Sequence, residues 1–138
     1  MSTDFYDAFS RHDADADLLL ENGRWANADH HYGLAAECAL KALLLQQGIP
    51  PNNGDMPSGR QYRPYRTHIN HLWDSYQNFM QTRNDYPIPA DNPFQDWDIS
   101  QRYASKTDIT EQAARSHAAA VGTLKNIIKQ AIFDGVLL

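Results

Sequence analysis

Polar side chains recur at helical spacing between residues 30 and 41. His30, Glu37 and Lys41 are seven and four residues apart, so a helix would present all three on one face. Glu37 and Lys41 also stand in the order in which an i, i+4 pair attracts most strongly. One interpretation is a structural ion pair of Glu37 with Lys41 or with Arg102. The sharper one is that these side chains contact a bound ligand.

Positive charge and aromatic rings alternate in the stretch GRQYRPYRTH, residues 59–68. Arginine binds phosphates and tyrosine rings stack on bases, and proteins recognise single-stranded RNA with such pairs. In a chain of net charge −5 we favour a solvated loop whose arginines offset the acidic first helix, with RNA contact as the alternative. The residues concerned are Arg60, Tyr62, Arg63, Tyr65 and Arg66.

The remaining histidines and the single cysteine suggest packing more than catalysis. His68 and His71 share a helical face, a spacing compatible with metal ligands, but no HExxH motif or cysteine cluster completes a site. We therefore expect no metal and no cofactor. His71, next to Leu72, is expected in the core or a groove. His117 is expected as a hydrogen-bonded core residue, and Cys38 as a buried, unreactive thiol.

Helices are the elements that must position these residues. Apolar residues recur with a helical period, Gly and Pro mark the segment ends, and no segment alternates as a strand does. The fold class is therefore all-α, and the wide apolar side of the second helix places it at the centre. The expected helices are 3–23, 25–47, 69–80 and 110–133 with a short helical piece at 97–105, and the expected long loops are 48–67 and 84–96.

Composition limits the class of protein. The 138 residues suit one domain, 1–138, and the net charge of −5 argues against a polycation that coats nucleic acid. Cys38 is the only cysteine, so no intrachain disulfide can form and a cytoplasmic location is expected. No apolar run is long enough to cross a membrane, so we expect no membrane partner.

Several of these residues occur in an order that resembles the HEPN superfamily. An Asp-rich first segment leads to Gly23-Arg24-Trp25, then to the string HYGLAAECALKALL (31–44), to HxxHL at 68–72 and to Arg102-Tyr103. The resemblance covers almost the whole chain, and residues 35–44 are its most specific part. It implies an up-and-down bundle of four to five helices, often dimeric. Members include RNase toxins and non-catalytic partners of nucleotidyltransferases.

The nuclease motif of that superfamily is incomplete where it should lie. Nuclease members carry an Arg separated from a His by four to six residues, with the Arg stabilising the phosphate and the His moving protons. Here Arg102 matches, but the positions for His hold Thr107, Asp108 and Ile109. The same spacing occurs in other elements, in the pairs Arg66–His71 and Arg24–His30.

The resemblance therefore implies a non-catalytic nucleotide- or RNA-binding or interaction module. It also implies a homodimer, and a nucleotidyltransferase of toxin–antitoxin type as partner. The alternative is a metal-independent endoribonuclease whose Arg–His pair comes from Arg102, His71 and Arg66. The tryptophans Trp25, Trp73 and Trp97 are expected in the core or at the dimer interface. The expected ligand-binding residues are His30, Glu37, Lys41, His71, Arg102 and Tyr103.

Overall fold

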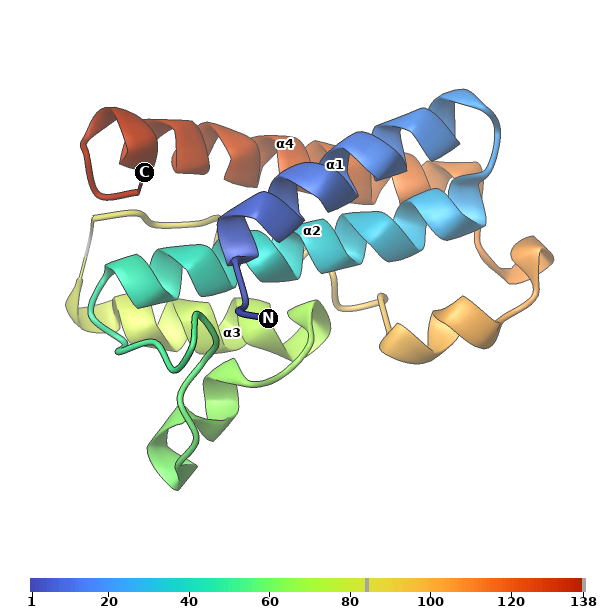
Figure 1. The fold of residues 1–138 in the computed structure, drawn as a ribbon. Coiled ribbons are helices and arrows are strands. Elements are labelled where there is room, and N and C mark those ends of the chain that lie inside the picture. The colour runs from blue at the N-terminus through green and yellow to red at the C-terminus, as the bar shows by residue number, and fades with distance from the viewer. Residues whose placement is uncertain (84, 138) are drawn as a thin grey trace.

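Four α-helices form the framework of the computed structural model, which describes residues 1–83 and 85–137 (Figure 1). They are α1 (Phe5–Glu21), α2 (Trp25–Gln46), α3 (Ile69–Phe79) and α4 (Glu111–Phe133). Short 3₁₀ helices occupy Arg60–Tyr65, Met80–Thr82, Ile99–Tyr103 and Lys106–Asp108. The described residues contain no strand, so the all-α prediction is confirmed. Asn84, the first residue of the expected loop 84–96, lies outside the described residues.

Local signals set the helix ends close to where the sequence predicts them. The Asp4 carboxylate accepts the backbone N–H of Asp7 at 3.0 Å and so caps α1. The Thr110 hydroxyl caps α4 by accepting the N–H of Ala113 at 3.1 Å. Between α1 and α2 the chain turns at Gly23, whose φ of +73° favours glycine.

Helix α2 lies at the centre of the molecule and packs against the three other α-helices (Figure 1). Its middle consists of Ala and Leu, which have high helix propensity and small or unbranched side chains. Residues 35, 36, 39, 40, 43 and 44 are all completely buried. The predicted central position of this helix is therefore confirmed.

The helices do not alternate in direction as an up-and-down bundle would. Helices α2 and α3 end together, since the Arg83 guanidinium donates to the Gln47 carbonyl at 2.6 Å. Near the start of α4, His117 contacts Asp29, which lies near the start of α2. Thus α1 is antiparallel to α2, whereas α2, α3 and α4 run the same way (Figure 1). The expected up-and-down order is wrong because the two long connections return the chain along the bundle.

The connection between α3 and the last helix is packed rather than loose. Tyr86, Ile88 and Phe94 are buried in the core. The Trp73 indole N–H donates to the Pro89 carbonyl at 3.0 Å. These contacts attach the connection, over residues 86–94, to the core and to α3.

Two of the three tryptophans lie in the core, which is one of the two expected positions, and not at a dimer interface. Trp73 and Trp97 are 0% and 1% exposed within one chain, so a second copy cannot contact them. Trp25 at the start of α2 is partly exposed.

None of the helices in the described part of the chain has both the length and the apolar character that crossing a membrane requires.

Candidate functional site

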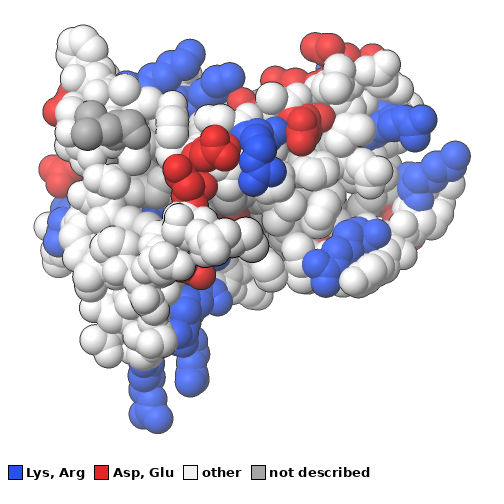
Figure 2. Space-filling model, in the orientation of Figure 1, with Lys and Arg blue, Asp and Glu red and all other residues white. Residues whose placement is uncertain are grey.

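A cleft of about 840 Å³ lies between the α1–α2 turn and the segment that leads into α4. Three cationic side chains line this basic cleft, namely Arg24, Arg102 and Lys106. Figure 2 shows Lys and Arg side chains at the right-hand end of the molecule, where Figure 1 places these two segments. Uncharged polar and aromatic residues add to the lining: Asn22, Trp25, Asn27, Gln101, Thr107 and Thr110.

The three cations of the basic cleft form no ion pair with any described residue. Glu111 is the one carboxylate in the lining, and it pairs with Arg115 at 2.7 Å. Like charges that converge on one cleft repel one another unless an anion lies between them. The cleft is therefore suited to phosphate or another anion.

The α1–α2 turn fixes the backbone at Arg24. The Asn22 side-chain amide donates to the Leu18 carbonyl at 2.8 Å and closes the end of α1. The backbone N–H of Arg24 donates to the Leu19 carbonyl at 2.9 Å. Arg24 thus directly precedes α2 on a short turn held by its own hydrogen bonds.

The opposite wall is a short helix that carries Arg102. The Asp98 carboxylate accepts the Ser100 N–H at 2.8 Å, and the Gln101 side chain accepts the Asp98 N–H at 3.1 Å, which is a capping box. Hydrogen bonds from Ser100 lower the pKa of Asp98, so this cap stays ionised at neutral pH. The Arg102 guanidinium lies over the Tyr103 ring at 4.8 Å.

Behind this wall, three side chains form an Asp–His–Asp triad: Asp29, His117 and Asp96. Asp29 and His117 are both 2% exposed, and His117 Nδ1 lies 2.5 Å from Asp29 Oδ1. His117 Nε2 lies 3.0 Å from Asp96 Oδ1 and 3.1 Å from the Pro93 carbonyl oxygen. The second Asp29 oxygen accepts the Gln101 amide at 2.6 Å. The triad therefore joins α2, α4 and the wall of the cleft.

Opposing effects act on the pKa of His117. Burial lowers the pKa, whereas the hydrogen bonds and negative charges of Asp29 and Asp96 raise it, and the net direction is upward. A buried carboxylate such as Asp29 needs a partner, because an uncompensated charge in the interior costs several kcal/mol. The protonated ring supplies that partner.

Trp97 attaches the same wall to α2. Its indole N–H donates to the Asp29 carbonyl at 3.0 Å. The ring occupies the space beside Gly33, where a Cβ would lie only 2.0 Å from it. His30 stacks on the Trp97 ring with centroids 6.0 Å apart. Burial, followed by the charges of His31 and Arg102, lowers the pKa of His30.

The structure does not bring the six predicted ligand residues together. Glu37 Oε2 accepts from Lys41 Nζ at 2.9 Å, and Glu37 Oε1 lies 2.9 Å from His68 Nδ1. The predicted Glu37–Lys41 pair is therefore confirmed, whereas the alternative pair of Glu37 with Arg102 is not formed. Arg102 lines the basic cleft, and Tyr103 beside it is 80% exposed.

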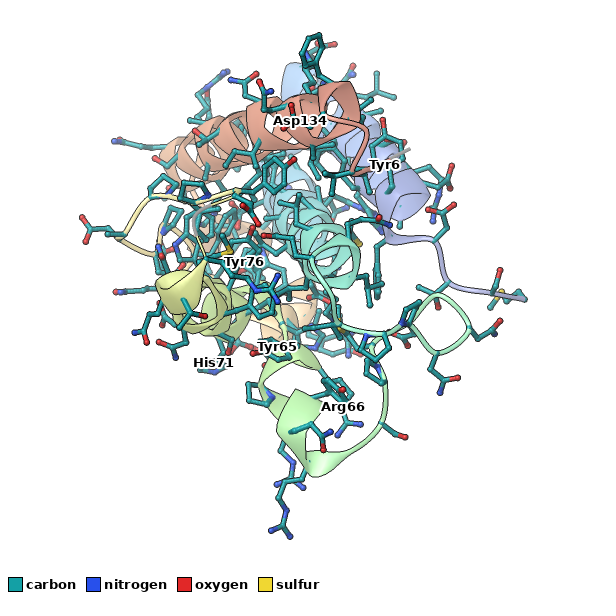
Figure 3. All side chains as sticks on the ribbon, turned by 90° about the vertical axis from the view of Figure 1, so that its left-hand side faces the viewer. Tyr6, Tyr65, Arg66, His71, Tyr76 and Asp134 are labelled. Atoms are coloured by element: carbon teal, nitrogen blue, oxygen red, sulfur yellow. The ribbon has the colours of Figure 1, made fainter. Side chains whose placement is uncertain are left out.

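The prediction for His71 is wrong, whereas those for His117 and Cys38 are confirmed. His71 is exposed on the outer side of α3, so its expected core or groove position is wrong (Figure 3). The reason is that the buried face of α3 is the stripe Ile69, Leu72, Trp73 and Tyr76, and His71 lies off that stripe. His117 is confirmed as a satisfied core histidine, and burial raises the pKa of Cys38 to about 12, as expected for an inert thiol.

In the segment 59–68 the arginines and the tyrosines face different ways. Arg60, Arg63 and Arg66 are exposed, whereas Tyr62 and Tyr65 pack against the core. The Tyr65 ring meets Phe79 edge-on, with centroids 6.0 Å apart (Figure 3). The tyrosine faces proposed for base stacking are thus largely used in packing.

Sequence reasoning missed Arg24 and Lys106 as partners of Arg102, and it missed Asp29. The first two are brought to Arg102 only by the fold. Asp29 did carry an indirect signal, because a satisfied core histidine implies a buried acceptor. No three His, Cys, Asp or Glu side chains of the described chain are arranged to hold a metal ion.

Comparison with protein-family models, curated proteins and solved structures finds no match for this chain.

Proposed function

We propose that this protein is a non-catalytic, HEPN-like binding module that takes the phosphate groups of a nucleotide or of RNA into the basic cleft. The observation that carries the proposal is that Arg24, Arg102 and Lys106 all line one cleft, with no described carboxylate paired to them. In a chain of net charge −5, three cations gathered without counter-charges point to an anionic ligand.

The dimensions and the lining of the cleft support a nucleotide-sized ligand. Its volume of about 840 Å³ lies within the usual range of small-molecule sites, roughly 300–1,000 Å³. Arginine can bind a phosphate through two parallel N–H donors, and lysine adds a point charge. Trp25 offers an aromatic surface and Asn27 a side-chain amide, which suit a base.

The absence of an imidazole from the cleft lining supports binding rather than cleavage. Thr107 occupies the first position at which the HEPN nuclease motif would place its histidine. A threonine hydroxyl can donate a hydrogen bond to phosphate, but it does not exchange protons near neutral pH as a general acid or base must.

The alternative, a metal-independent endoribonuclease, is favoured by one observation. His30 lies near enough to Arg102 for the guanidinium charge to lower the pKa of its ring. A neutral imidazole beside an arginine could act as a base. The His30 ring is, however, stacked on the Trp97 ring, which indicates a role in packing.

Fluorescence anisotropy with a labelled eight-nucleotide RNA, and competition by ATP, test the proposal. We expect Arg102→Ala to weaken binding about tenfold, because a hydrogen bond to a charged group contributes about 1.5–3 kcal/mol. Lys129→Ala, which removes one exposed positive charge of α4 away from the cleft, is the matched control. Equal effects of the two variants, or no binding of either probe, would contradict the proposal.

The same RNA incubated with the protein in EDTA separates binding from catalysis. We expect the RNA to remain intact. Cleavage that disappears in His30→Ala, in protein that keeps its helical circular dichroism, would establish the endoribonuclease instead.

Homodimer formation and a nucleotidyltransferase partner belong to the proposal through the resemblance. Phe133 and Leu18 are 87% and 60% exposed and are apolar side chains that another chain could cover. Sedimentation velocity distinguishes the dimer from the monomer directly.

A further inference from the structure

The Asp–His–Asp triad has a hydrogen-bond pattern that only a protonated ring can satisfy. Nδ1 of His117 faces the Asp29 carboxylate, and Nε2 faces both the Asp96 carboxylate and the Pro93 carbonyl. All of these groups are acceptors. A neutral imidazole carries one N–H, so one of its nitrogens would face acceptors with a lone pair.

The surroundings of His117 are anionic on two sides. From α2 the ring faces Asp29, and from the connection before the short helix it faces Asp96 and the Pro93 carbonyl. The Phe94 ring stacks on it with centroids 4.8 Å apart. Loss of the proton would therefore leave Asp29 without its counter-charge and would turn the Nε2 contacts from attractive to repulsive.

A short chain of contacts leads from His117 to Arg102. Asp29 binds His117 through one carboxylate oxygen and Gln101 through the other, and its backbone carbonyl accepts the Trp97 indole N–H. Gln101 directly precedes Arg102 and is part of the capping box that forms the short helix. Gln101 and Trp97, which attach this short helix to α2, therefore both bind Asp29, the residue whose charge His117 neutralises.

We propose that His117, acting through Asp29, is a positioning residue that holds Arg102 at the basic cleft when protonated and releases it when neutral. The proposal rests on the proposed function, because the cleft is the site whose anion affinity it sets. Arg102 itself contacts the ligand, whereas His117 and Asp29 do not reach it.

The expected direction with pH follows from the raised pKa of His117. Below that pKa the triad is complete and anion affinity is high. As the pH rises through that pKa, the segment 93–103 loosens and the affinity falls. The pKa of His30 is lowered instead, so its titration falls at lower pH than that of His117.

The test follows RNA affinity and the His117 ring signals by NMR over the same pH range. The probe is a four-nucleotide RNA without terminal phosphates, because its phosphodiesters do not titrate there. For the wild-type protein we expect RNA affinity to fall at least about fivefold as the pH rises, and the midpoint of this fall should equal that of the His117 titration. The Trp97 indole and Arg102 amide signals of the free protein should change with the same midpoint.

Asp96→Ala is the decisive variant, because the Asp96 side chain is 72% exposed and its loss should not prevent folding. Removing this carboxylate lowers the pKa of His117, so the affinity midpoint should move to lower pH by the same amount. Asp91→Ala removes an exposed carboxylate from the same connection and should leave the midpoint in place. His117→Gln, if it folds, should abolish the pH step.

A midpoint of affinity that stays fixed when the pKa of His117 moves would overturn the proposal. Trp97 and Arg102 signals that do not follow the His117 titration in the free protein would also overturn it. If the wild-type protein binds no RNA at all, the proposed function fails, and the Trp97 and Arg102 signals still decide the positioning role.

Discussion

The basic cleft and the segment 59–68 carry equal numbers of cationic side chains, yet their surroundings differ. In the cleft, Arg24, Arg102 and Lys106 converge from two walls on one concave space. In the segment 59–68, three arginines lie exposed on a part of the chain that projects from the body of the protein (Figures 1 and 3). The number of cations therefore does not distinguish a site from a solvated surface.

The distinction lies in how each group of charges is held. The arginine-bearing walls of the cleft are fixed by the α1–α2 turn, the capping box and the Asp–His–Asp triad. In the segment 59–68, one hydrogen bond of the described residues involves an arginine side chain, from Arg66 to the Pro57 carbonyl at 3.5 Å. A cleft whose walls have a fixed backbone binds a ligand at a smaller entropic cost of ordering.

The largest difference between the two regions is expected when all three positive charges are removed from each. We expect the triple variant R24A/R102A/K106A to lower RNA affinity at least about 100-fold, since each charge-assisted contact contributes about 1.5–3 kcal/mol. The triple variant R60A/R63A/R66A has the same change in net charge, and we expect it to lower affinity less than about threefold by weakening the general field. Anisotropy at one fixed salt concentration measures both.

Equal losses in the two triple variants would show that net charge alone governs binding. A larger loss in the variant of the segment 59–68 would move the site to that segment.

A smaller effect is expected when the wall of the cleft is disturbed without touching its charges. In Gly33→Ala the new methyl group would lie 2.0 Å from the Trp97 ring, so the ring and its segment must shift. Overpacking of this kind costs about 1–3 kcal/mol, and we expect a matching fall in the free energy of unfolding and a weaker affinity for RNA.

Gly122→Ala is the matched control for that substitution. Apart from the chain neighbours and the backbone of α4 itself, no atom lies within 4 Å of a Cβ at Gly122, which is in the interior of α4. Alanine has the higher helix propensity, so we expect the free energy of unfolding to rise by about 0.5–1 kcal/mol with RNA affinity unchanged. Urea unfolding measures both variants, and a Gly33→Ala protein as stable as the wild type would refute the packing argument.

The features that the sequence predicted are those with local causes. The helices and the Glu37–Lys41 pair depend on residues within one or two turns of one another, so periodicity and spacing reveal them. The parallel course of α2, α3 and α4 depends on how the long connections pack, which no local pattern encodes.

The candidate site was harder to predict for the same reason. Arg24 and Arg102 line the same cleft because Trp97 and Gln101 attach a distant segment to Asp29. From the sequence, Arg102 could be selected by resemblance, but its partners could not. Of the two alternatives for Glu37, the local pair with Lys41 forms and the distant pair with Arg102 does not, since the second partner of Glu37 is His68 from the start of α3.

The most direct measurement is a map of the RNA contact on the protein. Unlabelled eight-nucleotide RNA is titrated into ¹⁵N-labelled protein, and the shifts of the backbone and arginine side-chain signals are followed by NMR. We expect the largest shifts at Arg24, Arg102 and Lys106, with the signals of Arg60 and Arg63 nearly unchanged. Shifts confined to the segment 59–68 and absent from the cleft would show that RNA does not bind in the cleft.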